Sequence, residues 1–587
     1  MRYWCCVERC IATQGNAMEN ARIGAIFDRI ADILEIQGGN PFRIRSYRNA
    51  ARTVRDLTDR LADLADEGKD LTDLPGIGDS IAEKIHEILR TGTCRTLRDL
   101  QDEVPAGLPE LLKVPNLGPK RAKQLYDDLG IASLDDLKKA AEAGKIRGLE
   151  GFGEKTEQQI LQGLETVRAE AGRHGIKEAM DRVEDLGRHL DGVKGIARWQ
   201  VAGSFRRRRE TVGDLDILVR AKDRGKAADG ILAYEAIDEV QAHGEEKITV
   251  RLAGGMQVDF RFIDAESFGA AQMYFTGSKA HNITLRKRAQ RDGLKLNEYG
   301  LFKGKKRKAG KTEEEVYGAL GLPWIPPELR EDRGEIDAAD AGGLPDLIEP
   351  ADIRGDLHAH TSATDGANTI DELVRAARGR KYAYLAVTDH SKAVTVAGGL
   401  DDDALRRHAD KVRKAAAGEK RFGLLAGVEV DILKSGRLDI GEKVLADLDW
   451  VVASVHSYFH LDADAMTDRL LAAVRSGVVH CLGHPFGRLI GRRDPLRFDA
   501  ERVFEACRDE GVCLEINAYP DRLDLPDVWC KRAREIGCTM VVACDVHKTS
   551  DMDFMGLGVS VARRGWLEKG DVLNTRTLSA LRKWLKT

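Results

Sequence analysis

The chain has 587 residues, 42% of them hydrophobic and 32% charged, with a formal net charge of −4 at pH 7. One hydrophobic core rarely grows to this size, so we expect roughly four folding units, and the hydrophobic content excludes a disordered or fibrous protein. No apolar run approaches the roughly 20 residues that span a bilayer, and ten cysteines without regular spacing favour reduced thiols over a disulfide framework.

The first 17 residues show neither the apolar core of a signal peptide nor helical periodicity. We expect them to form a disordered tail, and a start codon placed too far upstream is the alternative. From Met18 to about Glu170 the sequence predicts short amphipathic helices in which one template occurs three times. Each copy has an apolar anchor, a turn with glycine, and a helix with apolar residues three and four apart. The copies begin at Leu74, Val114 and Leu149.

This repeated template resembles the helix-hairpin-helix motif. Its glycines let the backbone approach a ligand closely, and the amides at the N-terminus of the second helix can face a phosphate. One copy alone would be as well explained by a plain helical turn, but three copies predict sequence-independent binding to the DNA backbone. The middle copy has Asn116 where the others have their first glycine. The expected contact residues are Gly76, Gly78, Gly118, Gly151 and Gly153.

Between Val201 and Asp264 the apolar residues alternate with a period of two, which predicts strands. Asp214 and Asp216 are two apart in one such strand and therefore face the same side, and Asp259 lies in a second strand. Carboxylates gathered in this way repel one another unless cations lie between them. Three of them suit a pair of Mg²⁺ or Mn²⁺ ions that promote phosphoryl transfer.

Acid pairs at strand ends are common surface features, so this interpretation depends on what precedes them. Gly203 and Ser204 form a predicted turn whose amides and hydroxyl suit a triphosphate, and Arg207, within the basic run 206–209, can neutralise its charge. Together these residues resemble the palm of the nucleotidyltransferase superfamily. That superfamily also contains enzymes that add single nucleotides to RNA or to drugs.

The segment that begins Tyr274-Phe-Thr-Gly-Ser resembles the nucleotide-selection segment of family X DNA polymerases. By that resemblance, Tyr274 and Phe275 pack against the sugar and exclude a 2′-hydroxyl. Asn282 contacts the incoming base, and Arg286 lies on the template side. Gly277 belongs to the same nucleotide-binding set. Taken alone, the two aromatic residues favour core packing over a nucleotide contact.

The N-terminal residues 40–51 resemble the 5′-phosphate-binding helix of the small lyase domain in the same family. Lys84 aligns with the Schiff-base lysine of that domain, and partial burial at the edge of an apolar helix face would activate its amine. A surface lysine that extends along that face is the alternative interpretation. Ser80 stands where some relatives carry another lysine, and Arg208 stands where the family usually has glycine.

After Pro350, apolar strands alternate with helical patterns, which indicates an α/β barrel or layered fold. Nine of the fourteen histidines fall in this part of the chain, most of them at strand ends beside carboxylates. A lone histidine in a strand is usually part of the core, but imidazoles gathered with carboxylates are the ligands of Zn, Mn or Fe hydrolase sites. His358 and His360, two apart on one strand, can bind together.

This second pattern resembles the PHP (polymerase and histidinol phosphatase) domain, a distorted β/α barrel that holds three metals. The resemblance implies hydrolysis of phosphoesters with up to three Mn²⁺ or Zn²⁺ ions. His408, His460 and His480 lack the pattern and are expected to be structural. The nine ligand positions that the resemblance assigns are His358, His360, Asp365, His390, Glu429, His456, His484, Asp545 and His547.

Together, these resemblances imply a bacterial or archaeal family X DNA polymerase with a C-terminal PHP domain. The expected fold is multidomain, with α-helical lyase-like and helix-hairpin-helix domains, an α+β palm, and a distorted (β/α)7 barrel. The expected boundaries are a tail at 1–17, a lyase-like domain at 18–95, a helix-hairpin-helix subdomain at 96–175, the palm at 176–265, the nucleotide-selection subdomain at 266–325, a linker at 326–350, and the PHP domain at 351–587.

The function that this resemblance implies is the filling of short gaps during DNA repair, joined to a metal-dependent 3′-5′ exonuclease. It also implies 3′-phosphatase or abasic-site endonuclease activity as further candidates. The expected partners are gapped or primed DNA and dNTPs, with no membrane, and we expect a monomer in the cytoplasm, at the bacterial nucleoid.

Three alternatives stay open at this point. The first is a small-molecule phosphatase of the PHP type that carries a non-catalytic DNA-binding half, and the intact acid triad speaks against it. The second is a nucleotidyltransferase that acts on RNA ends, which the three hairpins disfavour. The third is a structural protein that binds DNA ends with both sites silent.

Overall fold

The computed structural model describes residues 16–56, 61–66, 68–74, 76–105, 107–114, 117–170, 172–417 and 422–585. Residues 1–15 of the expected tail lie outside these ranges, as does Asn116. The chain forms two compact units, one N-terminal to about residue 171 and one that contains most of the remainder. Among the described residues, no helix has both the length and the apolar character to cross a membrane.

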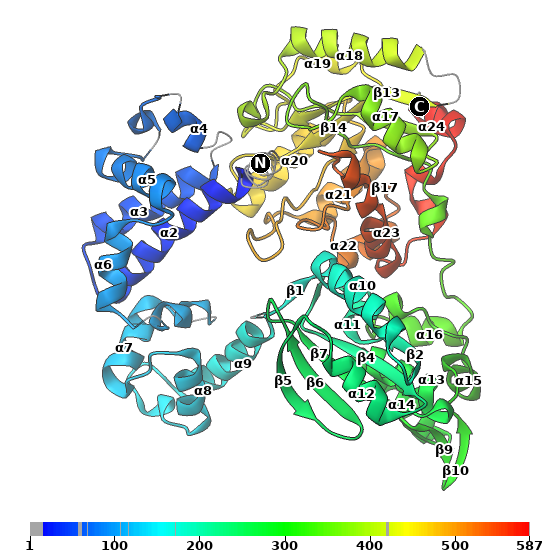
Figure 1. Ribbon diagram of the computed structural model, residues 1–587. Coiled ribbons are helices and arrows are strands. Elements are labelled where there is room, and N and C mark those ends of the chain that lie inside the picture. The colour runs from blue at the N-terminus through cyan, green and yellow to red at the C-terminus, as the bar shows by residue number, and fades with distance from the viewer. Residues whose placement is uncertain are drawn as a thin grey trace, which may run out of the picture. The chain divides into compact units, whose positions relative to one another are not determined.

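The N-terminal unit consists of helices around a single apolar core that runs from Ile23 to Leu164 (Figure 1). Its helices bury one face each, as α5 does with Ile81, Ile85 and Ile88. The helices are α2 (Asn16–Ile36), α3 (Pro41–Asp56), α4 (Leu61–Asp66), η1 (Leu71–Asp73), α5 (Asp79–Thr91), α6 (Arg95–Glu103), η2 (Leu108–Lys113), α7 (Pro119–Leu129), α8 (Leu134–Glu142), η3 (Ile146–Gly148) and α9 (Glu154–Glu170).

The three repeated turns of this unit share one pattern of exposure. In each turn a buried apolar residue precedes an exposed glycine and the start of a helix, and these buried residues are Ile77, Leu117 and Phe152. Gly76 and Gly151 have φ angles of 79° and 77°, which glycine adopts without steric cost. The apolar residue anchors the turn, so the glycine backbone stays at the surface.

The second unit begins with a five-stranded sheet, the palm sheet, in the order β2-β4-β7-β6-β5. Strands β4 and β7 are parallel, and the other pairs are antiparallel. The strands are β2 (Ile196–Val201), β4 (Asp214–Ala221), β5 (Ile237–His243), β6 (Lys247–Leu252) and β7 (Gln257–Phe262), and β1 (His174–Gly175) pairs with β3 (Thr211–Val212) beside them.

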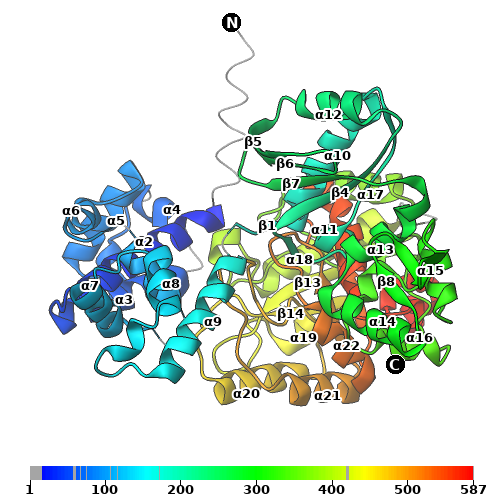
Figure 2. The same ribbon diagram turned by 90° about the horizontal axis from the view of Figure 1, so that it is seen from below.

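Helices α10 (Ile176–Gly192) and α12 (Arg224–Leu232) lie side by side on one face of the palm sheet (Figure 2). The imidazole Nε2 of His189 on α10 lies 2.8 Å from the Gly230 carbonyl oxygen on α12. The short helix α11 (Gly203–Arg206) directly precedes β3 and β4. Helices α10 and α12 therefore cover one face of the palm sheet, and the loop that contains α11 leads into the start of β4.

The palm sheet is followed by helices α13 (Phe268–Thr276), α14 (Lys279–Arg291) and α15 (Glu313–Ala319) and by a three-stranded sheet. The sheet has the order β10-β9-β8, with strands β8 (Lys295–Asn297), β9 (Gly300–Lys303) and β10 (Lys306–Ala309). Residues 326–350, which the sequence predicts as a linker, contain helices with buried apolar residues. The segment holds η5 (Pro327–Leu329) and α16 (Glu335–Asp340), and Leu329, Ile336 and Ala339 are buried in the apolar core of this region.

The C-terminal part is a parallel seven-stranded sheet with strands in sequence order, β11 to β17. The segment after β11 pairs with the segment after β17. The amide of His360 donates to the Val546 carbonyl at 2.8 Å, and the amide of Val546 donates to the His358 carbonyl at 3.0 Å. The barrel is therefore nearly closed, and its apolar core includes Tyr384, Trp450 and Val541.

The strands of the barrel are β11 (Gly355–Asp356), β12 (Tyr384–Val387), β13 (Gly423–Asp431), β14 (Trp450–Ser454), β15 (Cys481–Leu482), β16 (Cys513–Asn517) and β17 (Met540–Ala543). Its helices are α17 (Ile370–Gly379), α18 (Asp402–Ala417), α19 (Glu442–Leu445), α20 (Ala463–Val474), α21 (Ala500–Glu510), α22 (Asp527–Ile536), α23 (Met555–Arg564) and α24 (Leu578–Trp584). The expected fold class, with helical, α+β and seven-stranded barrel parts, is confirmed.

Candidate functional sites

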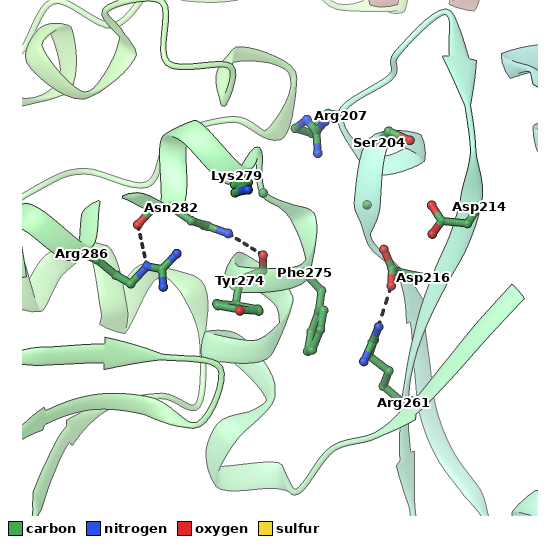
Figure 3. Close-up of a pocket in the computed structure, with 12 residues that line it drawn as sticks. Ser204, Arg207, Asp214, Asp216, Arg261, Tyr274, Phe275, Lys279, Asn282 and Arg286 are labelled. Atoms are coloured by element: carbon green, nitrogen blue, oxygen red, sulfur yellow. Dashed lines mark hydrogen bonds and ion pairs between the residues drawn. The ribbon is translucent and has the colours of Figure 1, made fainter. Parts of the chain in front are cut away.

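A cavity of about 390 Å³ opens between the palm sheet and helices α13 and α14 (Figure 3). Every nucleotide-binding residue expected from the sequence lines this cavity. These residues lie on α11, α13 and α14 and in the turns that follow them. Asp214 and Asp216 face the cavity from β4. Its lining is Gly203, Ser204, Arg207, Asp214, Asp216, Arg261, Tyr274, Phe275, Gly277, Lys279, Asn282 and Arg286.

The three palm acids are neighbours because β4 and β7 are parallel and in register, with Asp216 opposite Asp259. Asp214 and Asp216 line the cavity, whereas Asp259 is buried beside it, 4% exposed. Asp259 accepts a hydrogen bond from the Thr249 hydroxyl at 2.8 Å, and Lys247 Nζ lies 2.7 Å from its other oxygen. Burial and the charge of Asp214 raise the pKa of Asp216 to about 6.

Burial and the charge of Asp259 likewise raise the pKa of Asp214. Raised pKa values mean that the negative charge of these carboxylates is incompletely balanced by the protein. The site therefore suits divalent cations, for which carboxylate oxygens are preferred ligands.

Besides Lys247, the protein itself places the cation Arg261 among the acids, and Arg261 was not predicted from the sequence. Its guanidinium lies 3.4 Å from Asp216 Oδ1 and donates to Asp259 Oδ2 at 3.1 Å, and it covers the ring of Phe275 at 4.3 Å. The signal was available, because Arg261 follows Asp259 by two positions in a strand and must therefore face the same side.

Position 203 requires a glycine because its backbone lies against the carboxylate of Asp216. Its φ is 64°, and a Cβ atom there would come within 2.9 Å of Asp216 Oδ2. Only glycine lets the backbone of the α11 loop lie this close to the carboxylate.

The aromatic pair and the polar residues of α14 form one connected group. The rings of Tyr274 and Phe275 meet edge to face at 5.1 Å, and the Asn282 amide donates to the Tyr274 carbonyl at 2.7 Å. The Arg286 guanidinium covers the Tyr274 ring at 6.0 Å. Figure 3 shows these side chains on the side of the cavity opposite Asp214 and Asp216.

Arg207 reaches the cavity from the end of α11. Its Nε donates to Glu331 Oε1 at 3.0 Å and another guanidinium nitrogen donates to the Thr276 carbonyl. Burial outweighs the attraction of Glu331 and lowers the pKa of Arg207, which remains a cation at any physiological pH.

In the N-terminal unit, Lys84 lies on α5 and donates from Nζ to the Ser80 hydroxyl at 2.8 Å and to the Ser80 carbonyl at 2.9 Å. Ser80 therefore binds the amine of Lys84, which is the nucleophile that the resemblance implies. The contact glycines Gly76, Gly78, Gly118, Gly151 and Gly153 are all exposed.

The barrel gathers its histidines and acids at the carboxyl ends of its strands. Among the residues that the structure describes, three groups of side chains have ligand atoms within 4.8 Å of one another: His360, Asp365, His390 and His547; His358, His360 and Asp545; and His390, Glu429 and His456. His484 joins them, with Nε2 at 2.9 Å from Glu429 Oε1. All nine positions expected from the sequence thus meet at one end of the barrel.

The residues of this cluster fit a metal centre. Neutral imidazoles and carboxylates are the ligand set of hydrolytic metal sites, and Nε2 of His358 and Nδ1 of His360 are buried without a hydrogen-bond partner. Burial opposes ionisation of Glu429, but the surrounding imidazoles outweigh it and hold the pKa of Glu429 well below its usual range. A ligand that is already ionised binds a cation without first losing a proton.

Carboxylates behind the cluster were not found from the sequence. Glu515, in the middle of β16, lies 2.6 Å from His358 Nδ1 and accepts a hydrogen bond from the His484 amide at 2.6 Å. Asp431 lies 3.1 Å from His456 Nδ1. Such partners fix which imidazole nitrogen faces the metal. Asp431 is the last residue of β13, and a carboxylate at a strand end was the signal that could have revealed it.

Two of the three histidines that we expect to be structural, His408 and His480, contact protein groups outside the nine expected ligand positions. His408 Nε2 lies 2.7 Å from Asp389, which also accepts hydrogen bonds from Thr361. His480 Nδ1 accepts the Val451 amide at 3.1 Å, and its ring stacks on Trp450.

Comparison with known protein families matches four segments of the chain. Residues 18–94 match a helix-hairpin-helix domain, and residues 108–166 match a SAM-like helix-hairpin-helix tandem. Residues 271–331 match the DNA polymerase beta thumb, and residues 356–519 match the PHP domain.

Three curated proteins illustrate how far these likenesses extend. The DNA polymerase/3′-5′ exonuclease PolX of Bacillus subtilis is 38% identical over 573 residues, which cover 97% of this chain and all of that protein. DNA polymerase lambda of Rattus norvegicus is 28% identical over 56% of this chain and 59% of its own length. A probable phosphatase of Photobacterium profundum is 29% identical over 34% of this chain and 79% of its own length.

The match to PolX spans both the palm cavity and the barrel cluster within one chain. The protein therefore belongs to the PolX family, the family X DNA polymerases that carry a C-terminal PHP domain.

Proposed function

We propose that this protein fills short gaps in DNA at the palm cavity and removes nucleotides from 3′ ends at the barrel cluster. One observation carries the proposal. A cavity lined by two carboxylates and a full set of expected nucleotide-binding residues lies in the same chain as a buried imidazole–carboxylate cluster. The first arrangement suits joining of nucleotides, and the second suits hydrolysis of phosphoesters.

At the palm cavity, Asp214, Asp216 and Asp259 would hold two Mg²⁺ or Mn²⁺ ions. When bound, such ions bring the attacking and leaving oxygens of a phosphoryl transfer together and neutralise their charge. Ser204 and Arg207 bind the triphosphate, the aromatic pair Tyr274 and Phe275 contacts the sugar, and Asn282 and Arg286 contact the base pair. Preorganised donors and charges of this kind stabilise the transition state.

At the barrel cluster, the nine side chains would hold up to three Mn²⁺ or Zn²⁺ ions. Cations at such a site lower the pKa of water and polarise a phosphoryl oxygen. Glu515 and Asp431 orient the imidazoles His358 and His456 toward the centre. The same chemistry extends to 3′-phosphate groups and to abasic sites in DNA.

The N-terminal unit supplies binding to gapped or primed DNA. Its exposed glycine turns, including Gly76, Gly78, Gly118, Gly151 and Gly153, approach the phosphate backbone without reading base sequence. Lys84 is the candidate nucleophile of a lyase reaction, for which its amine must leave Ser80. We further propose that the protein acts as a monomer in the cytoplasm, at the nucleoid.

The polymerase assignment is tested on DNA with a single-nucleotide gap, with dNTPs and Mg²⁺ or Mn²⁺. Wild-type protein is expected to extend the primer, and the Asp214→Asn plus Asp216→Asn variant is expected to lose extension by several orders of magnitude, because the amides cannot hold the cations. Binding of the variant to the gapped DNA serves as the control for folding. Primer extension at the wild-type rate by the variant would refute the assignment.

A small-molecule phosphatase is the second candidate for the barrel, favoured by the likeness to the probable phosphatase. The wild type is assayed on three substrates: a labelled single strand, a strand with a 3′-phosphate, and p-nitrophenyl phosphate. Our proposal predicts release of nucleotides from the first. Turnover of p-nitrophenyl phosphate alone would favour the second candidate.

A further inference from the structure

The last turn of α23, an outer helix of the barrel, reaches the loop that forms one wall of the palm cavity. Arg564 ends this helix, and its side chain is 3% exposed. One of its guanidinium nitrogens donates to the carbonyl oxygen of Arg207 at 2.6 Å and to Glu331 Oε1 at 3.0 Å. The other donates to Asp527 Oδ2 at 2.6 Å. A buried arginine of the barrel thus binds the main chain of a residue that lines the palm cavity.

Arg564 and Arg207 share one carboxylate oxygen. The Nε of Arg207 also donates to Glu331 Oε1, at 3.0 Å. Glu331 therefore interacts with two guanidinium groups at once, and the positive charge of Arg564 repels that of Arg207. Both effects weaken the net attraction between the Glu331 carboxylate and the Arg207 guanidinium. The positive charge of Arg207 can then act on a ligand in the cavity.

A second barrel arginine holds the same loop three residues further on. Arg488, 8% exposed, donates from both terminal nitrogens to Glu210, at 2.6 and 3.3 Å. Arg488 also donates to the Leu523 carbonyl, which fixes it within the barrel. The loop from Arg207 to Glu210 is therefore bound at each end by a buried arginine of the barrel.

We propose that Arg564 is a positioning residue of the palm site, through which the barrel sets the affinity of the polymerase for its incoming nucleotide. Arg564 touches neither substrate nor reacting atoms. It fixes the main chain of Arg207 and offsets Glu331, so that Arg207 can bind the triphosphate. This inference rests on the proposed function, in which the palm cavity receives a dNTP.

The surrounding charges allow Arg564 to be replaced without leaving an acid unpaired. Without Arg564, Glu331 is still paired with Arg207. Asp527 is still paired with Arg333, whose guanidinium lies 3.0 Å from the Asp527 carboxylate. Arg564→Met is therefore expected to fold. The matched control is Arg563→Met, because Arg563 precedes it on α23 and binds Glu328 at 2.8 Å and Glu349 at 2.6 Å without reaching the cavity.

The test measures single-nucleotide gap filling by the full-length protein and separates KM for the dNTP from kcat. Arg564→Met is expected to raise KM roughly tenfold, the effect of losing one hydrogen bond to a charged group, with a much smaller change in kcat. Arg563→Met is expected to keep the wild-type KM. Arg564→Lys, which keeps the charge, is expected to restore part of the affinity. Nuclease activity and melting temperature of the same samples report on the barrel.

An unchanged KM in Arg564→Met, or an equal rise in Arg563→Met, would overturn the inference. If Arg564→Met melts well below the wild type, KM is measured at a temperature at which every variant is folded, and a wild-type KM for Arg564→Met there overturns the inference equally. Wild-type protein that inserts no nucleotide at all would instead refute the proposed function, and the inference with it.

Discussion

Glu515 shows how one buried carboxylate organises two candidate metal ligands. Its oxygens lie 2.6 Å from His358 Nδ1 and from the His484 amide nitrogen, and it is 1% exposed. Burial opposes protonation of His358, but Glu515, Asp545 and Glu429 outweigh it and raise the pKa of His358 well above its usual value. A proton held on Nδ1 by Glu515 directs Nε2 toward the centre of the cluster.

Glu515→Gln is therefore expected to weaken Mn²⁺ binding at the barrel by roughly 10- to 100-fold, the usual cost of losing such a partner. Isothermal titration of metal-free protein with Mn²⁺ measures this directly. The control is Asp524→Asn, because Asp524 is fully buried in the same barrel but accepts from the Phe486 amide and touches none of the proposed ligands. Equal affinities for Glu515→Gln and wild type would show that Glu515 does not act on the metal.

At the scale of an element, the hairpin turns of the N-terminal unit combine an exposed glycine with open space around it. Gly78 directly precedes α5, its φ of −99° is open to any residue, and a Cβ atom there would meet nothing within 4 Å. Glycine is thus not needed at this position for folding. The proposed function supplies another reason, which is the close approach of a phosphate backbone.

Gly78→Ala is expected to leave the melting temperature unchanged and to weaken binding to gapped DNA roughly fivefold, as for loss of one backbone contact. Fluorescence anisotropy with labelled gapped DNA measures the affinity. Gly192→Ala is the matched control, since Gly192 is exposed at the end of α10 and also has open space. Unaltered affinity in Gly78→Ala would argue against a phosphate contact at this turn.

Helix α15 carries a buried ion pair that stabilises the region beside the palm. Glu313, 4% exposed, binds Arg330 at 2.7 Å and Arg206 at 2.7 Å. Burial alone would raise the pKa of Glu313, but the two guanidinium groups outweigh it and hold that pKa far below its ordinary value of 4.5. Because the pKa is lower in the folded state, this stabilisation is complete above the ordinary value and is lost as pH falls below it.

Glu313→Gln is therefore expected to lower the free energy of unfolding by about 3 kcal/mol at pH 7, because it leaves buried guanidinium groups without their partner. The difference from wild type is expected to shrink as the pH falls through the acid range. Urea denaturation at neutral and acidic pH measures both effects. Glu314→Gln, on the exposed side of the same helix, is expected to behave as wild type, and a pH-independent deficit in Glu313→Gln would contradict this account.

At the scale of the whole molecule, the sequence predicts those parts of each site that local periodicity reveals. Asp214 and Asp216 share a face because they alternate in one strand, and the barrel histidines meet because parallel strands end at the same edge. Arg564, Arg488 and Glu515 could not be found in this way. The partners described above for these three residues lie between 31 and 357 positions away in sequence, and only the folded chain brings them together.

The predicted linker differs from the structure for a related reason. Its glycine, alanine and acidic residues are typical of an exposed connection, yet Glu335 is buried and lies 2.6 Å from His281 Nδ1. A single buried acid with a distant partner has no periodic signal, so composition alone is misleading in this segment.

The central claim is that two separate cation-binding clusters act on phosphate in one chain, one to join nucleotides and one to cut them. A single primer that is labelled at its 5′ end and bound in gapped DNA tests this most directly, with primer length followed in the presence of dNTPs and Mn²⁺. We predict that Asp214→Asn plus Asp216→Asn only shortens the primer and that His358→Ala plus His360→Ala only lengthens it. Loss of both activities in each variant, or of neither, would contradict the claim.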